Sequence, residues 1–238
     1  MSVDDWRSTA AANNAEWCDL VCRSHGADTT LDGQAWTTRT RSPRFYPDAV
    51  TLTPDVFVEA LLARIDDSAG CSVKDSFASL DLSAHGFRVL FEAQWIISGV
   101  LPAAPAGGLR WEVVRSRDGL AEWEAAWGNG GTDLGLFRAE LLGHDSVAVL
   151  GGRRDGDLVA GAVLNSSTRV VGISNFFAVP ADAGQEHAAA ARSDCIAYAE
   201  SVRPGTRFCG YESGSELVDA LRTGFEEVGP LRVWIRDE

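Results

Sequence analysis

The residues from Val170 to Glu200 combine an apolar strand, a short glycine loop and an alanine-rich helix. The predicted strand ends before Pro180, and Gly184 lies in the loop that leads into the helix. This order commonly binds phosphate, because free backbone N–H groups and the helix dipole point at the ligand. Asp182 and Glu186, however, place carboxylates where a phosphate would bind. Three interpretations follow: a working anion site, a degenerate one, or an ordinary turn in which Glu186 stabilises its own helix.

A second group with chemical potential is the basic stretch from Arg39 to Leu52. Arg39, Arg41 and Arg44 fall close together in an otherwise acidic chain. Arginine side chains bind phosphate and carboxylate through paired N–H groups. This stretch either supplies positive charge to the anion site or pairs with acidic side chains of the protein surface.

Five cysteines could bind metal or form disulfides. Cys18 and Cys22 lie one helical turn apart, with His25 just beyond, but no fourth ligand follows at a spacing typical of zinc sites. An odd number of cysteines in a chain without a secretion signal favours buried thiols over a disulfide framework. We therefore expect core thiols and no metal site.

The composition limits the class of protein. The chain has 238 residues, of which 45% are hydrophobic, so it can bury a sizeable core. Its formal net charge of −13 argues against a nucleic-acid partner. No apolar stretch reaches the length of a membrane span, and the acidic N-terminus does not resemble a signal peptide. These features predict a soluble cytoplasmic protein without membrane or nucleic-acid partners.

A linker from Leu101 to Arg110, rich in proline and glycine, divides the chain into predicted domains 1–105 and 106–238. In the first domain we expect a helix over Asn14–Ser24 and another over Thr53–Asp67, with Thr53 as its cap. Short strands are expected on both sides of the second helix, and a longer one follows Gly86.

The second domain shows a clearer pattern. Its predicted elements are two helices after the first strand, a hairpin around Asp155-Gly156, a long buried strand from Val170, and then alternating helices and strands. The second of the early helices is expected at Leu134–Leu142. Antiparallel strands followed by strand–helix–strand crossovers predict a mixed α/β sheet with helices on both faces.

This order resembles the GNAT superfamily of acyl-CoA-dependent N-acyltransferases over roughly Leu109 to Glu238. The closing segment ALRTGFEEVGPLRVWIR is similar to the last helix, Gly-Phe step and terminal strand of that family. Gly224 suits a helix end, because glycine adopts a left-handed conformation at low cost. The resemblance implies a mixed, mostly antiparallel sheet flanked by helices. It also implies the transfer of an acetyl or other short acyl group from acyl-CoA to an amine of a small molecule or protein.

In GNAT enzymes the central strand pairs with the pantetheine arm of the cofactor, and the following loop binds the pyrophosphate. Gly184 retains a glycine of that loop, whereas Ala183 stands where arginine or glutamine is usual and Glu186 replaces a small residue. The loop is thus a degenerate form of the family motif. By this resemblance the cofactor-binding residues for acetyl-CoA or another acyl-CoA are Phe177, Val179, Gly184, Gln185, Ala188 and Ser213.

The resemblance also indicates where catalytic groups are expected. Ala220 stands where the family usually has a tyrosine on the last helix. Tyr211 and Glu212, at a strand end, are the nearest substitutes, with the tyrosine as acid and the glutamate as base. The alternative is that Glu212 or Ser213 caps the helix that follows.

Two functions therefore remain open from the sequence. One is the N-acyltransferase, and the alternative is a catalytically inactive GNAT-like binding or regulatory module, acting as a homodimer. The first domain, with its own Gly86-Phe87 step, is either a vestigial GNAT-like repeat or an unrelated cover that packs tryptophan and phenylalanine side chains on the second.

Overall fold

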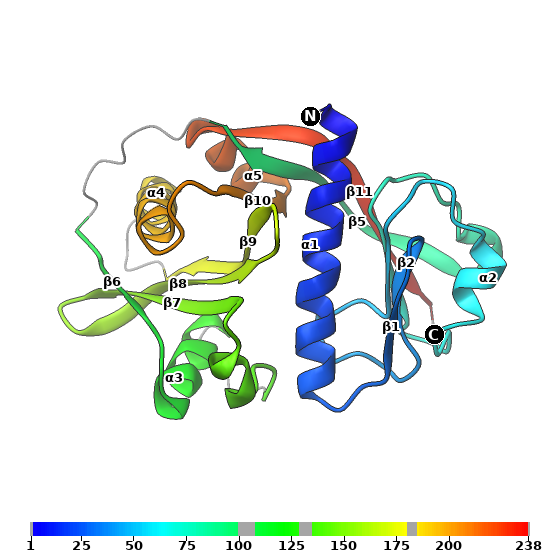
Figure 1. Cartoon of the computed structure of the whole chain (residues 1–238), viewed down its shortest axis with the longest axis horizontal. Coiled ribbons are helices and arrows are strands. Elements are labelled where there is room, and N and C mark those ends of the chain that lie inside the picture. Colours follow the sequence, from blue (N-terminus) through cyan, green and yellow to red (C-terminus); the bar gives the residue numbers. More distant parts are fainter. Residues whose placement is uncertain (1, 100–107, 129–134, 180–184, 238) are drawn as a thin grey trace. The chain divides into compact units, whose positions relative to one another are not determined.

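The structure is a computed structural model that describes residues 2–99, 108–128, 135–179 and 185–237 (Figure 1). Contacts divide the chain into two units. Unit 1 comprises Met1–Ile97, Tyr211–Gly214 and Glu227–Glu238, and unit 2 comprises Ser98–Gly210 and Ser215–Glu226. Most of the predicted linker lies outside the described residues. The division at residue 105 stays a prediction, and unit 1 also includes most of the C-terminal strand, from Glu227 onward.

Unit 1 is built on a mixed, mostly antiparallel sheet with the strand order β1-β2-β3-β4-β11-β5. β1 with β2, β2 with β3, and β4 with β11 pair antiparallel, whereas β3 and β4 are parallel. The elements are α1 (Val3–Ser24), β1 (Thr29–Leu31), β2 (Ala35–Thr38), β3 (Ala49–Thr51), α2 (Val58–Leu62), β4 (Ser72–Asp75), the 3-10 helix η1 (Ser83–His85), β5 (Phe87–Ser98) and β11 (Phe225–Arg236).

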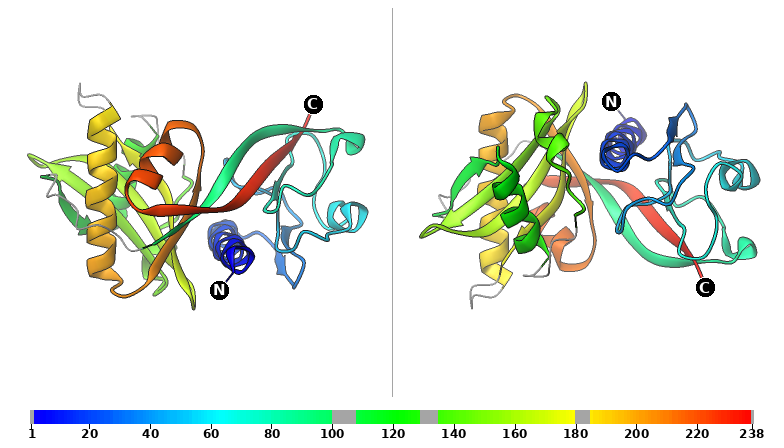
Figure 2. Two further views of the ribbon diagram at one scale, coloured as in Figure 1. Left: turned by 90° about the horizontal axis from the view of Figure 1, so that it is seen from above. Right: turned by 90° about the horizontal axis from the view of Figure 1, so that it is seen from below.

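The sheet of unit 2 has the order β10-β9-β8-β7-β6. β6 to β9 pair antiparallel in succession, and β9 and β10 are parallel. α3 and α4 lie on opposite faces of this sheet (Figure 2). The elements are β6 (Arg110–Val113), α3 (Arg117–Trp127), the 3-10 helix η2 (Ala139–Gly143), β7 (Val147–Arg154), β8 (Asp157–Ser166), β9 (Val170–Ala178), α4 (Gln185–Val202), β10 (Arg207–Glu212) and α5 (Gly214–Arg222). The prediction of a mixed, mostly antiparallel sheet flanked by helices is confirmed.

The helix predicted over Thr53–Asp67 is wrong in its extent. α2 has five residues and begins after Phe57, so Thr53 does not cap it and Pro54 does not occupy its first turn. The Pro54 carbonyl instead accepts a hydrogen bond of 2.9 Å from the Ser79 hydroxyl. A tertiary contact therefore holds this segment outside the helix, against its local preference.

The helix predicted over Leu134–Leu142 is also wrong. Leu134 lies outside the described residues, and the segment after it forms only a 3-10 helix from Ala139. The amides of Leu136 and Phe137 donate to the Glu124 carboxylate at 2.6 and 2.9 Å. These amides are therefore not available for helical hydrogen bonds.

α1 begins eleven residues earlier than the predicted start at Asn14, since it spans Val3–Ser24. Ser2 and Asp5 form a capping box in which each side chain accepts a hydrogen bond from the other's backbone amide. This reciprocal cap explains the early start.

All five cysteines are buried and free, as predicted. Burial raises the pKa of Cys18 to about 11 and that of Cys195 to about 12. Protonated thiols of this kind are poor nucleophiles and poor metal ligands. Within the described residues, no group of three or more His, Cys, Asp or Glu side chains is placed to hold a metal ion. None of the described helices combines the length and hydropathy that a membrane span requires.

Candidate functional site

A bulge interrupts the pairing of β9 with β8. Gly161 lies opposite Phe177 and Val163 lies opposite Ser174, so Ala162 alone faces two residues of β9, namely Asn175 and Phe176. Asn175 has a φ of 54°, in the left-handed region that asparagine tolerates better than most residues. Bulges bend the strand that carries the extra residue.

The pairing of β9 with β10 ends just before this bulge. The parallel ladder joins Val170, Val171 and Gly172 to Arg207, Phe208 and Cys209. In the part of the chain that the structure describes, the ladder has no member after Gly172. β9 nevertheless continues beside β8 as far as Ala178. β9 therefore separates from β10 after Gly172 while it stays paired with β8, and the bulge lies in the separated part.

Strand alternation decides which backbone groups face the separated edge. The Val179 amide donates to the Val159 carbonyl at 2.7 Å, so it points towards β8. In an antiparallel pair, successive residues direct their backbone groups to opposite edges. The amide of Ala178 is therefore directed away from β8. Val179, which was predicted to bind the cofactor, already has its amide bonded within the sheet.

The side chain of Phe177 belongs to the core of unit 2. Its ring lies 5.3 Å from that of Trp123 on α3, and a Cβ atom at Gly161 would overlap both rings. The Trp123 indole N–H in turn donates to the Leu150 carbonyl at 2.8 Å. On the opposite face, the Arg192 guanidinium of α4 lies 4.4 Å from the centre of the Phe176 ring. Rigid packing on both faces thus fixes the course of β9.

The loop after β9 was the part of the site with the most specific predictions. Gly184, with Pro180, Asp182 and Ala183, lies outside the described residues. Gln185 is the first residue of α4, and Ala188 is half-buried in the first turns of that helix. The interpretation of this loop as a degenerate phosphate site stays a prediction.

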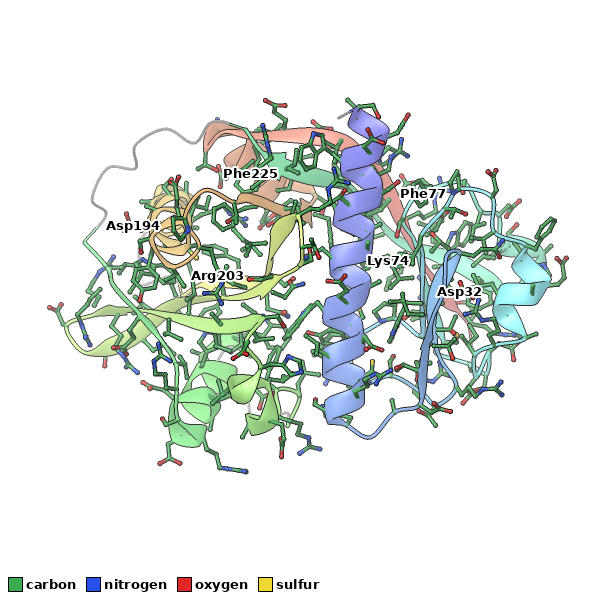
Figure 3. The ribbon with its side chains drawn as sticks, viewed as in Figure 1. Asp32, Lys74, Phe77, Asp194, Arg203 and Phe225 are labelled. Atoms are coloured by element: carbon green, nitrogen blue, oxygen red, sulfur yellow. The ribbon has the colours of Figure 1, made fainter. Side chains whose placement is uncertain are left out.

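Tyr211 lies in an aromatic cluster of unit 1. Its ring stacks on that of Phe91 with 6.5 Å between the ring centres, and it contacts the Trp95 ring edge-on with 5.5 Å between the centres. The Lys74 ammonium lies 4.3 Å from the ring centre and donates to the Asn14 carboxamide at 2.7 Å. Figure 3 labels Lys74 among the side chains of unit 1. Lys74 is 4% exposed, so this cation–π contact is shielded from water.

Glu212 and Ser213 follow Tyr211 in the chain. Glu212 is the half-buried last residue of β10, and Ser213 is exposed immediately before α5. The structure thus places the three predicted residues of this stretch in unit 1, and those of β9 and α4 in unit 2. Their roles stay predictions.

Comparison with known proteins gives a consistent result at the level of structure. No family model and no curated protein matches the sequence. A GCN5-related N-acetyltransferase from Kribbella flavida matches with a TM-score of 0.65 at 18% identity, over 96% of each chain. This chain has the GNAT fold. A GCN5-related N-acetyltransferase from Sphaerobacter thermophilus (TM-score 0.53, 13% identity, 86% of this chain and 81% of that one) agrees with it. A GCN5-related N-acetyltransferase-like protein from Streptococcus suis also matches, with a TM-score of 0.52 at 14% identity, over 97% of this chain and 98% of that one.

The structural match extends the resemblance found in the sequence. The sequence motifs of the GNAT fold were recognised from Leu109 onward, whereas 96% of the chain aligns with the Kribbella flavida protein. Residues of both units therefore have counterparts in that GNAT structure. At these identities the likeness establishes the fold alone.

Sequence reasoning missed the roles of three residues around the predicted site. Asn175 carries the bulge, Ala178 directs its amide to the separated edge, and Lys74 contacts the Tyr211 ring. Two signals were present: Lys74 is the only lysine in the chain, and Gly161 interrupts a strand of otherwise packed residues. A glycine inside a strand often marks a bulge or a close approach.

Proposed function

We propose that this protein is an N-acyltransferase that moves an acetyl or other short acyl group from acyl-CoA to an amine. The observation that carries the proposal is the edge of β9 after Gly172, where pairing with β10 stops while pairing with β8 continues. A strand edge of this kind offers amides and carbonyls to an extended guest. The pantetheine arm of CoA is extended and contains two amides, so the backbone edge fits it.

The proposal assigns roles to particular residues of the chain. The Ala178 backbone pairs with the arm of the cofactor, and Phe177 fixes the strand through its packing on Trp123. Gln185 and Ala188 lie at the start of α4, whose N-terminal end favours the pyrophosphate charge. Gly184 and Ser213 keep the roles that the GNAT resemblance implies. When bound, acyl-CoA supplies a thioester that is activated for attack by the amine.

Tyr211 and Glu212 are proposed to move the protons. Glu212 takes the proton that the amine must lose, and Tyr211 gives its phenolic proton to the departing sulfur. The acidic character of the chain, with a net charge of −13, favours a cationic amine as acceptor.

Replacing Ala178 by proline tests the backbone role. The substitution removes the N–H that faces the separated edge and leaves the bonds to β8 in place, so unfolding stability should change by less than about 1 kcal/mol. We expect the thermal stabilisation by acetyl-CoA, about 2.7 kcal/mol at a hundred times its dissociation constant, to be lost in Ala178→Pro.

Val179→Pro is the matched control for this experiment. It removes the amide that bonds to Val159, so it should lower stability by roughly 1–3 kcal/mol. An unaltered acetyl-CoA shift in Ala178→Pro would refute the backbone role, and the lack of any shift in the unsubstituted protein with every short acyl-CoA would count against the whole proposal.

A second candidate is a GNAT-fold module without catalysis, and the packing of Tyr211 favours it. Its ring is fixed between Phe91, Trp95 and Lys74, an arrangement that equally suits a structural side chain. Tyr211→Phe keeps this packing and removes the phenolic proton. If Tyr211 is the acid, release of CoA in the presence of a panel of amines should fall by about 10²-fold or more, with the acetyl-CoA thermal shift unchanged.

Tyr198→Phe on α4 is the control, because this half-buried tyrosine has no proposed role. Equal activity in Tyr211→Phe and Tyr198→Phe would exclude Tyr211 as the acid. Binding of acetyl-CoA without turnover of any amine would instead support the non-catalytic module.

A further inference from the structure

The N-terminal half of β5 is exposed on both faces. Every residue from Arg88 to Glu92 is exposed, and the three central ones, Val89, Leu90 and Phe91, are apolar and 39%, 46% and 38% exposed. Successive strand residues point to opposite sides of a sheet, so apolar surface is exposed above and below. Such a segment is unusual in a monomeric protein.

The backbone edge beside this segment is also open to a partner. β5 runs beside β11 along one edge (Figure 2). Towards its other edge, the Tyr211 ring at the end of β10 contacts Phe91 and Trp95. The Phe208 amide of β10 donates to the Ser98 hydroxyl at the C-terminal end of β5, at 2.8 Å. β10 has six residues and β5 has twelve, so among the described residues β10 does not extend along the whole of that edge.

The sequence of the exposed segment is complementary to itself. It reads Arg-Val-Leu-Phe-Glu, with opposite charges at its two ends and an apolar centre. If two copies pair antiparallel about a two-fold axis at Leu90, Arg88 of one copy lies opposite Glu92 of the other, and Val89 lies opposite Phe91. If both ends of the segment carried charges of the same sign, the two copies would repel each other in this arrangement. The opposite charges of Arg88 and Glu92 attract each other instead.

Ion pairs to β11 and to the residue that follows it extend this complementarity. Arg88 pairs with Asp237 at 2.7 Å, and Glu92 pairs with Arg232 at 2.8 Å. Across the axis the charges would follow one another as Asp237, Arg88, Glu92 and Arg232, alternating in sign at each step. Opposite-charge neighbours on adjacent strands stabilise their pairing.

We propose that a second copy of this chain binds to this edge, through antiparallel pairing of β5 residues 88–92 of the two copies. The bound edge is isologous, so the assembly closes as a dimer and does not extend into a fibre. The proposal uses residues of unit 1 alone and does not depend on the acyltransferase proposal.

Two single charge reversals test it by sedimentation velocity over a range of concentrations. In Arg88→Glu, two glutamates meet at each end of the paired segment, and in Glu92→Arg, two arginines meet. Each variant alone should raise the dimer dissociation constant at least about tenfold. An equimolar mixture of Arg88→Glu and Glu92→Arg should recover the dimer. In the mixed dimer each end of the segment again pairs a glutamate with an arginine. The ion pair that each substitution removes within its own chain, with Asp237 or with Arg232, stays lost in the mixture.

Phe57→Ser provides the control, because Phe57 is another apolar residue of unit 1 and is 73% exposed. This variant should leave the dissociation constant unchanged. A monomer at all concentrations, a dimer insensitive to both reversals, or a mixture that stays monomeric would each overturn the proposal.

Discussion

Replacing Asp48 by alanine is expected to lower the free energy of unfolding by about 3–5 kcal/mol. Asp48 is 1% exposed, and its carboxylate accepts hydrogen bonds from three donors. The Ser42 amide donates at 2.8 Å, and the Ser72 amide and the Arg41 guanidinium each donate at 2.9 Å. Alanine leaves two largely buried amides and a charged side chain without their acceptor. Urea denaturation followed by tryptophan fluorescence measures the loss.

Asp66→Ala is a matched control, because this exposed carboxylate also pairs with Arg41, at 3.9 Å. Ion pairs at the surface contribute little to stability, so the urea midpoint should hardly move. Similar midpoints for the two variants would show that the buried hydrogen bonds of Asp48 are not what stabilises unit 1. The same contacts bear on the basic stretch, which was predicted either to supply charge to the anion site or to pair with acidic side chains. Arg41 follows the second alternative, since it donates to Asp48 and to the Ser68 hydroxyl, the latter at 2.8 Å.

The second large effect is expected for Glu124→Ala in unit 2, with a loss of roughly 3 kcal/mol. Glu124 lies on α3, is 4% exposed, and accepts hydrogen bonds from the amides of Gly135, Leu136 and Phe137. Bonds to a charged acceptor are stronger than those between neutral groups. Without the carboxylate, the buried Leu136 and Phe137 amides lose their partner, and the Phe137 ring that packs on Trp123 loses its anchor.

Glu122→Ala on the same helix is the comparison for this variant. Glu122 bonds to Arg153 in a pair whose carboxylate is 47% exposed, so its removal should cost less than about 1 kcal/mol. Hydrogen exchange adds a local measurement, because the Leu136 and Phe137 amides should exchange faster in Glu124→Ala and at the original rate in Glu122→Ala. Unchanged exchange in Glu124→Ala would contradict the anchoring role.

The local sequence predicted the structure correctly at turns and helix ends, where one or two residues determine the backbone conformation. The Asp155-Gly156 hairpin is present, with φ values of 53° and 100° that fit a two-residue turn of primed type. Gly224 follows α5 with a φ of 94°. α3 ends at Trp127, and Gly128 is its C-cap. The two turns with positive φ depend on a conformation that glycine adopts and most residues avoid.

Local sequence failed where distant residues compete for the backbone. Thr53 and Pro54 form a favourable helix start, yet the Ser79 hydroxyl binds the Pro54 carbonyl. The segment after Leu134 has helical periodicity, yet Glu124 takes its amides. In both cases a hydrogen bond from far along the chain outweighs a preference worth a fraction of a kcal/mol per residue.

In the candidate site, too, some features follow from local sequence and others from residues far apart in the chain. The sequence by itself determined most of the order of elements, because periodicity and turn residues are local properties, and through its motifs the GNAT resemblance, which in turn implied a separated central strand. Only the tertiary structure decided that the bulge falls at Asn175, that the amide facing the separated edge is that of Ala178, and that β11 pairs with β4 in unit 1. These features depend on which strand edges meet and in what register. Register is set by packing between residues far apart in the chain, which no local pattern contains.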